Sequence, residues 1–169
     1  MLLGFAGAFH RSELVALNVE DIELTRQALV IHMQRSKTNQ YGESEDKEVF
    51  YAPSADCCPV RATQEWLECI GRTSGTLFTR INRGNKDRAA QPGKTRLSDQ
   101  SVNGLVQHHL GSAYTAHSLR TSFVIVAVEV GQSNKAIKNQ TKQKTDAMIE
   151  RYARLDDAKR FNAAQYLGL

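Results

Sequence analysis

The chain has 169 residues, of which 41% are hydrophobic and 24% are charged, and its formal net charge is +4. These values are typical of one globular domain with its own core, and they exclude a disordered or collagen-like chain. The sequence contains no apolar run long enough to cross a membrane, and its cysteines at 57, 58 and 69 form neither a disulfide framework nor a zinc-binding pattern. We therefore expect a single domain over residues 1–169, in a reducing cytoplasm and without a metal site.

The first part of the chain predicts a helix followed by a small sheet. Apolar residues recur with rough helical spacing over residues 2–17. Three short β-branched or alternating segments predict antiparallel strands at 19–24, 28–34 and 49–52, with a polar hairpin tip at 36–47. Because Met1 is followed at once by residues of buried type and no helix cap, we also expect structure upstream of this chain.

The second part of the chain predicts mostly helices. Pro59 opens a helix that Gly71 ends, and an extended piece at 76–81 leads into a basic loop that reaches Arg96. Further helices are predicted at 100–110 (after the caps Ser98 and Asp99), 118–130, 134–139, 146–153 and 157–166. The apolar run 123–130 places its helix at the centre of the core. The predicted fold class is mainly α with a small antiparallel β-sheet (α+β).

Basic residues concentrate in two stretches. Between Arg72 and Arg96 the only acid is Asp87, and from Lys135 to Lys144 there is none. Such stretches are typical either of a surface that faces nucleic-acid phosphates or of solvated loops, and charge alone does not decide between them.

Three clusters far apart in the sequence carry the candidate chemistry. They are GAFHRSELVAL at 7–17, AHSLRTSF at 116–123 and QTKQKTDAMIERYAR at 140–154, and a fourth element, RSKTNQYGE, follows a predicted strand. In order and spacing these clusters resemble the sequence boxes of the tyrosine recombinase (phage integrase) family, and the resemblance covers essentially the whole chain. It implies the fold of that family's catalytic domain, with the family's upstream DNA-clamping (core-binding) domain absent from this chain.

The resemblance also implies a reaction and the residues that perform it. Tyr152 would attack a DNA phosphodiester and leave a 3′-phosphotyrosyl bond and a free 5′-hydroxyl, without metal or cofactor. Arg120 would hold the phosphate with its guanidinium fork, and His117 would exchange protons or hold the phosphate. Lys37 would donate a proton to the leaving oxygen. Glu13 would brace the site by bonding the hairpin or a neighbouring cation.

Two positions depart from the family pattern. The family's first catalytic arginine falls on His10, and Arg11 should point elsewhere because one helical step turns a side chain by roughly 100°. A histidine is mostly neutral at neutral pH, and the loss of one such transition-state interaction typically costs about 10²- to 10³-fold in rate. Gln143 stands where the family usually has histidine, but its amide can still donate a hydrogen bond to phosphate.

Three functions stay open at this stage. The first is a recombinase or integrase domain that cuts and rejoins double-stranded DNA, impaired by His10 and working with other subunits in a tetramer on DNA. The second is an inactive remnant that binds DNA or partner subunits. The third is a helical domain with no DNA role, in which His117, Arg120 and Tyr152 have only packing or capping roles. The C-terminal residues Phe161, Ala164, Tyr166 and Leu167 would dock on a neighbouring subunit or on their own domain.

Overall fold

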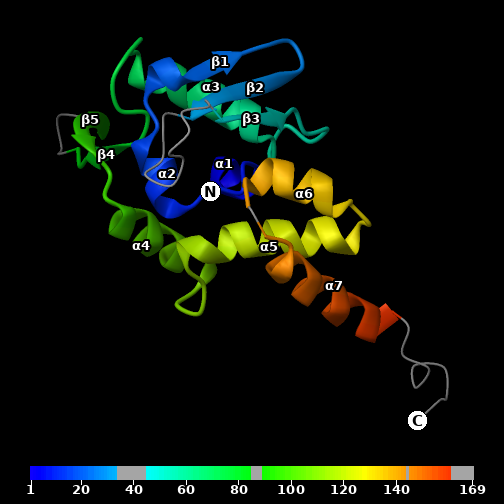
Figure 1. Cartoon of the computed structure of the whole chain (residues 1–169). Helices are drawn as coiled ribbons and strands as arrows, with labels where there is room; N and C mark the ends of the chain where they lie inside the picture. Colours follow the sequence, from blue (N-terminus) through cyan, green and yellow to red (C-terminus); the bar gives the residue numbers. More distant parts are fainter. Residues whose placement is uncertain (34–44, 85–88, 144, 161–169) are drawn as a thin grey trace.

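The computed structural model describes residues 1–33, 45–84, 89–143 and 145–160 (Figure 1). The helices are α1 (Leu2–Ala6), α2 (Arg11–Ala16), the 3₁₀ turn η1 (Val19–Asp21), α3 (Pro59–Ile70), α4 (Asp99–Leu110), α5 (Ala116–Glu129), α6 (Asn134–Thr141) and α7 (Ala147–Arg160). The strands are β1 (Ile22–Leu24), β2 (Ala28–Met33), β3 (Glu45–Phe50), β4 (Thr79–Asn82) and β5 (Gln91–Arg96). This confirms the mainly α class with small antiparallel sheets. None of the helices in the described ranges is long and apolar enough to cross a membrane.

The larger sheet has the order β1-β2-β3, and both pairings are antiparallel. Leu29, Ile31 and Val49 point to its inner face, where their exposed fractions are 0%, 0% and 2%. The strand predicted at 49–52 in fact begins at Glu45, because the main chain from Glu45 pairs with β2 as far as Met33. The part of the strand before Val49 is polar, so its hydrophobic pattern did not predict this pairing.

The smaller sheet consists of β4 and β5, which pair with an irregularity between Thr79 and Ile81. The prediction of a loop up to Arg96 was wrong for β5, which is a strand. The strand contains Pro92 and Gly93 and has no alternating apolar residues, so only its main-chain pairing with β4 identifies it.

Helix α5 crosses the molecule and contacts α1, α4, α6 and α7 (Figure 1). Helix α1 also contacts α3, so it lies between α3 and α5 at the centre of the fold. The main core includes Phe9, Ile31, Val60 and Leu77, all at most 2% exposed. A second buried cluster joins α5, α6 and α7 through Val124, Ala127, Ile137 and Ile149.

The helix predicted over residues 2–17 is in fact two helices, separated by the segment Gly7–His10, which we call the α1–α2 linker. Ala8 has a positive φ of 47°, and His10 is extended and forms the N-cap of α2. The apolar spacing continues across this break because Phe9 is buried from the linker itself, at 2% exposed. The periodicity of the pattern therefore did not reveal the interruption.

Helices α3, α4 and α6 lie within two residues of their predicted bounds, and Ser98 caps α4 by accepting a hydrogen bond from the Ser101 amide at 3.1 Å. Helix α5 begins at Ala116 and is not apolar-buried all round, since Val126 is 45% exposed and Val130 is 66% exposed. Helix α7 continues without a break to Arg160, because no glycine or proline interrupts it between the two helices predicted there.

Candidate functional site

The α1–α2 linker is held by side chains from three other elements. The carbonyl of Ala6, at the end of α1, accepts a hydrogen bond from Gln140 Nε2 at 2.8 Å. The next carbonyl, of Gly7, accepts one from Lys47 Nζ at 2.9 Å, and the carbonyl of Ala8 accepts one from Arg120 Nη1. Donors from α6, β3 and α5 thus satisfy consecutive carbonyls that the end of α1 leaves unpaired.

Arg120 is the most deeply placed of the predicted site residues, with an exposed fraction of 2%. Its Nη2 donates to the carbonyl of Thr141 at 2.7 Å, while its Nε has no hydrogen-bond partner in the described part of the chain. Burial lowers its pKa and Glu13 opposes that effect, but a guanidinium stays charged in proteins. The guanidinium is therefore fixed by backbone carbonyls, and its buried Nε is left without a partner among the described residues.

His10 and His117 lie next to each other, with ring centroids 6.2 Å apart and planes inclined by 11°. His117 is exposed on the first turn of α5, and His10 is exposed at the start of α2. Burial is the main cause that lowers the pKa of His10, and the charge of Arg120 lowers it further, against an opposing effect of Glu13. These effects favour the neutral form of His10, and its role as a substitute for the family's arginine stays a prediction.

Arg11 points away from this group and pairs with Asp99 at 3.2 Å. The expectation that Arg11 would point elsewhere is confirmed. The expected cause, a single helical step from residue 10 to residue 11, was wrong, because His10 is a non-helical cap residue.

Glu13 links His10, at the start of α2, to Lys47 on β3. Its Oε2 accepts a hydrogen bond from the His10 amide at 3.0 Å and lies 3.6 Å from Lys47 Nζ. Lys47 is 2% exposed, and its Nζ also lies 4.4 Å from the centroid of the Phe9 ring. Burial lowers the pKa of Lys47 to about 8, although Glu13 partly offsets this effect.

Sequence reasoning missed Lys47, which the hairpin tip at 36–47 included as a polar loop residue. A signal was present: Lys47 shares its strand face with Val49, two residues later, and Val49 faces the core. Gln140, which donates to the carbonyls of Ala6 and Glu48, was also missed. Every residue has a backbone carbonyl, so no sequence pattern marks the acceptor of such a bond.

Tyr152 and Gln143 contact residues other than Arg120, His10 and His117. Tyr152 is half-buried on α7 and packs against the cluster formed by Val124, Ala127, Ile137 and Ile149. In the described part of the chain, no hydrogen bond or ring contact joins Tyr152 to Arg120. Gln143 donates weakly to the sulfur of Met148 at 3.8 Å, and its buried Oε1 has no partner among the described residues. Lys37 and the four apolar residues from Phe161 to Leu167 lie outside the described residues.

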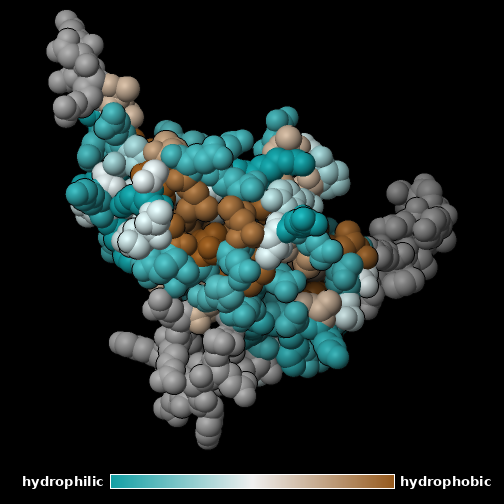
Figure 2. Space-filling view, turned by 90° about the horizontal axis from the view of Figure 1, so that it is seen from above, coloured by the Kyte–Doolittle hydropathy of each residue, from teal (hydrophilic) through white to brown (hydrophobic). Residues whose placement is uncertain are grey.

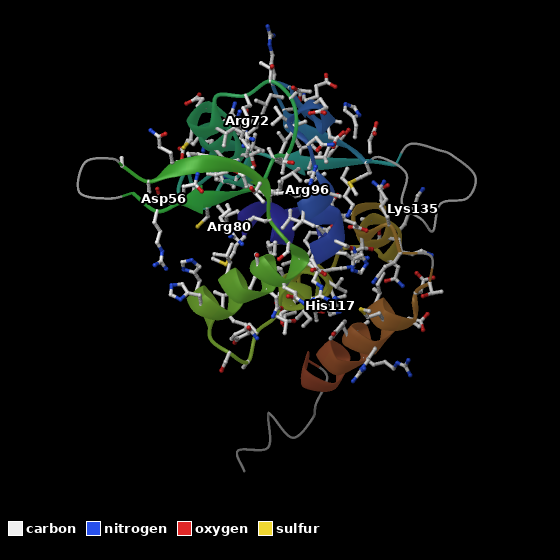
Figure 3. All side chains as sticks on the ribbon, turned by 90° about the vertical axis from the view of Figure 1, so that its left-hand side faces the viewer. Asp56, Arg72, Arg80, Arg96, His117 and Lys135 are labelled. Carbon is white, nitrogen blue, oxygen red and sulfur yellow. The ribbon has the colours of Figure 1, made fainter. Side chains whose placement is uncertain are left out.

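Some of the basic residues form hydrogen bonds within the fold, and others are exposed at the surface. Arg96 donates to the carbonyls of Val15 and Leu17 and to Asn18 Oδ1, so it fastens the end of α2 to β5. Arg80 and Lys135 are exposed. In the view of Figure 3, Arg80 and Arg96 lie above His117, with Lys135 to one side.

An apolar groove of about 430 Å³ lies between α1, β3, α5 and α6. Phe5, Phe50, Phe123, Val126 and Val130 contribute its largest apolar side chains. Figure 2 shows apolar side chains reaching the surface in the middle of one face, with hydrophilic residues around them. Over the described ranges, no cluster of His, Cys, Asp and Glu side chains could hold a metal ion.

Comparison with known proteins identifies the relatives of this chain. It is 38% identical over 156 residues to the integrase/recombinase xerD homolog of Selenomonas ruminantium, an alignment that covers 89% of this chain and 44% of the relative. The chain thus spans less than half the length of this curated relative. No protein-family model matches the chain.

Solved structures share the fold. The XerA recombinase superposes with a TM-score of 0.63 at 21% identity, over 99% of this chain and 55% of that protein. XerH site-specific recombinase, bound to palindromic difH substrate in a post-cleavage complex, gives a TM-score of 0.67 at 14% identity over 98% of this chain and 43% of that protein. The Tn1549 transposon integrase in complex with transposon right-end DNA gives 0.59 at 14% identity over 96% of this chain and 57% of that protein. This chain is therefore similar in sequence to an integrase/recombinase and shares its fold with solved recombinases and a transposon integrase.

Proposed function

We propose that this chain is a catalytic domain that cleaves and rejoins strands of double-stranded DNA through Tyr152. The observation that carries this proposal is the group of Arg120, His10 and His117. A buried, permanently charged guanidinium with an unpaired Nε lies next to two imidazole rings at the surface. Such preorganised donors stabilise the charge that develops on the nonbridging oxygens of a phosphodiester under attack.

The proposed reaction balances without a cofactor. The hydroxyl oxygen of Tyr152 forms a bond to phosphorus, the bond from phosphorus to the 5′-oxygen breaks, and a 3′-phosphotyrosyl link remains. The tyrosine proton passes to His117, and Lys37 gives a proton to the leaving 5′-oxygen. The 5′-hydroxyl of a second strand then attacks the phosphotyrosyl bond and releases Tyr152. Arg120, His10 and Gln143 hold the phosphate, and Glu13 braces them.

The proposed reaction brings the Tyr152 hydroxyl to a phosphate that Arg120 holds, and we propose that α7 moves when DNA binds to achieve this. In the unbound chain Tyr152 packs on the second apolar cluster. Such a movement would withdraw Ile149 and Tyr152 from the buried cluster that joins α7 to α5 and α6.

DNA and further recombinase subunits are the proposed partners. The XerH and Tn1549 structures contain DNA, and this chain shares their fold. Because the chain spans 44% of its curated relative, we propose that the remaining part of such a protein supplies the second half of the DNA grip. Exposed basic residues on the β4–β5 hairpin and α6 provide the electrostatic attraction of this half.

A second function, an inactive remnant that binds DNA or partner subunits, is favoured by one observation. The pKa of His10 is lowered, mainly by burial, so the neutral form is favoured in the position where the family's first catalytic arginine falls. Such a protein would retain the basic surface and lose the chemical step.

Relaxation of supercoiled plasmid tests both functions, because it requires no knowledge of the target site. The unaltered chain, His10→Arg and Tyr152→Phe are compared, and covalent protein–DNA adducts are trapped with detergent. Relaxation and an adduct that disappear in Tyr152→Phe would establish the enzyme. An adduct from His10→Arg alone would identify a remnant disabled at that position. Salt-dependent binding without an adduct from either protein would contradict the proposed chemistry of this domain.

A further inference from the structure

Lys47 has surroundings that a surface lysine of a DNA-binding protein does not have. Its side chain is 1% exposed, and its Nζ bonds to the protein's own main chain at Gly7. It extends from the middle of β3, where it pairs with Ile31, towards the core. A buried cation is retained at a cost in stability, because a well-packed apolar side chain of similar volume is often at least as stable. The position of its contacts indicates what this cation contributes.

The contacts of Lys47 converge on the α1–α2 linker. Its Nζ donates to the carbonyl of Gly7 at 2.9 Å, and the same Nζ lies over the Phe9 ring at 4.4 Å. One residue further, the carbonyl of Ala8 binds Arg120. Lys47 and Arg120 therefore hold adjacent carbonyls of the same segment from β3 and α5. A displacement of the Gly7 carbonyl would also displace the anchor of Arg120.

Lys47 also acts on α2 through Glu13. Its Nζ lies 3.6 Å from Glu13 Oε2, the same oxygen that accepts the His10 amide at 3.0 Å. An ion pair fixes the rotamer of Glu13, and Glu13 in turn fixes the backbone of His10. The other charged groups that act on Lys47 are Arg120 from α5 and Lys142 from α6, both positive. Within the described residues, Glu13 is the acid that balances this cluster of positive charge.

We propose that Lys47 is a positioning residue of this site, which holds the α1–α2 linker and the Glu13 carboxylate so that His10 and Arg120 keep their relative orientation. Lys47 does not touch DNA or take part in proton transfer. Its effect on the reaction rests on the proposed function, while its effect on the linker can be measured without DNA.

Amide hydrogen exchange tests the effect on the linker. The Phe9 amide donates to the Gly4 carbonyl at 3.1 Å, and the His10 amide donates to Glu13. Relative to the Val106 amide in the core of α4, exchange at Phe9 and His10 should accelerate about tenfold or more in Lys47→Met and stay near the original rate in Lys47→Arg. The matched control is Val49→Ala, which weakens the same buried strand without removing a charge. Equal acceleration in Lys47→Met and Val49→Ala would overturn the proposal.

Glu13→Gln provides a second variant if Lys47→Met does not fold. Glutamine keeps an oxygen that can accept the His10 amide and removes the charge that pairs with Lys47. Exchange at His10 should again accelerate, and unchanged exchange at His10 in Glu13→Gln would contradict the proposal.

The chemical step is tested by the rate at which the Tyr152 adduct forms. Lys47→Met should lose about tenfold or more in this rate with unchanged DNA affinity, and Lys47→Arg should recover most of it. An equal loss of affinity and rate would show that Lys47 acts through binding, against the proposal. If the unaltered chain forms no adduct at all, the proposed function fails, and the exchange rates alone decide whether Lys47 positions the linker.

Discussion

At the scale of single residues, the site is defined by how its cations are held. Arg120 is bound by the carbonyls of Ala8 and Thr141, which fix its guanidinium without neutralising it. A carboxylate partner would compete with the phosphate for the same donors, whereas carbonyls leave the full charge available. An arginine held by carbonyls is therefore better suited to bind a phosphate than an arginine held in a salt bridge.

Arg120→Lys should reduce the rate of adduct formation by about 10²- to 10³-fold, because an ammonium group cannot bond both carbonyls and also present a fork to phosphate. Single-turnover trapping of the adduct measures this rate. Arg26→Lys, at an exposed position between β1 and β2, is the control and should leave the rate unchanged. Similar rates for Arg120→Lys and the unaltered chain would exclude a phosphate-binding role.

The lowered pKa of His10 predicts how the advantage of an arginine at this position depends on pH. The histidine gains a proton, and with it a positive charge, only as the pH falls below the ordinary histidine range. The ratio of adduct rates, His10→Arg over the unaltered chain, should therefore be largest at neutral and alkaline pH and shrink at acidic pH. Rates measured from about pH 8 to about pH 5 give this ratio, and a constant ratio would contradict it.

The pKa of Lys47, lowered from 10.5 to about 8, links its protonation to stability. Between these values the unfolded chain binds the proton and the folded chain does not, so the free energy of unfolding rises with pH in this window. Below about pH 8 the folded chain carries the cost of the buried charge, on the order of 3 kcal/mol at most. Urea unfolding should show this rise in the unaltered chain and not in Lys47→Met. The same pH dependence of the unfolding free energy in both proteins would show that a group other than Lys47 causes the rise.

At the scale of elements, the break between α1 and α2 depends on close packing inside the linker. A Cβ atom on Gly7 would lie 2.2 Å from Cε2 of Phe9, which in turn lies beneath Lys47. Helix α1 has only five residues and gains little stability from its own hydrogen bonds. Its position is therefore set by the linker and by the helices that pack on it.

Gly7→Ala should lower the free energy of unfolding by about 1–3 kcal/mol, since Phe9 must move out of its buried place. Gly104→Ala is a matched control in the interior of α4, where an added Cβ would have no atom within 4 Å. It should raise the free energy of unfolding by about 0.5–1 kcal/mol through helix propensity. Urea denaturation measures both, and opposite signs for the two variants are the expected result.

At the scale of the whole molecule, the proposed binding to DNA depends on exposed positive charge. Arg80 and Lys94 are exposed on the β4–β5 hairpin, whereas Lys138 is already paired with Asp146 at 3.3 Å. Counterions released on binding make DNA affinity fall with salt, and the slope of this fall grows with the number of phosphates that the protein neutralises.

The double variant Arg80→Gln, Lys94→Gln should therefore bind DNA more weakly, with a salt slope smaller by about 1 for each phosphate that is no longer neutralised. Lys138→Gln should leave the slope close to that of the unaltered chain. Fluorescence anisotropy with a labelled duplex over a range of salt concentrations measures these slopes. Equal slopes for all three proteins would place the DNA-facing surface away from the hairpin.

The sequence predicted the fold class and the helices with local signals, such as Ser98 before α4 and Pro59 with Gly71 around α3. It did not predict the α1–α2 linker, because the apolar spacing is the same whether Phe9 is buried from a helix or from a turn. It missed Gln140 for another physical reason: its partners are backbone carbonyls, which every residue possesses, whereas Lys47 was missed because the strand β3 itself was predicted to begin at residue 49. The roles assigned to Tyr152, His117, Arg120, Gln143, Glu13, His10 and Lys37 remain predictions, and Lys37 lies outside the described residues.

The carbonyls at Ala6, Gly7 and Ala8 also bear on how such a chain evolves. Since a carbonyl survives any substitution, the bonds that Gln140 and Arg120 make do not depend on the side chains of residues 6 and 8, even though the burial and the positive φ of Ala8 restrict what fits there. Selection falls instead on the donors, which come from distant parts of the sequence. Among homologues, Lys47 and Glu13 should covary as a charge pair. A local signature around the linker would then weaken with divergence before the architecture does.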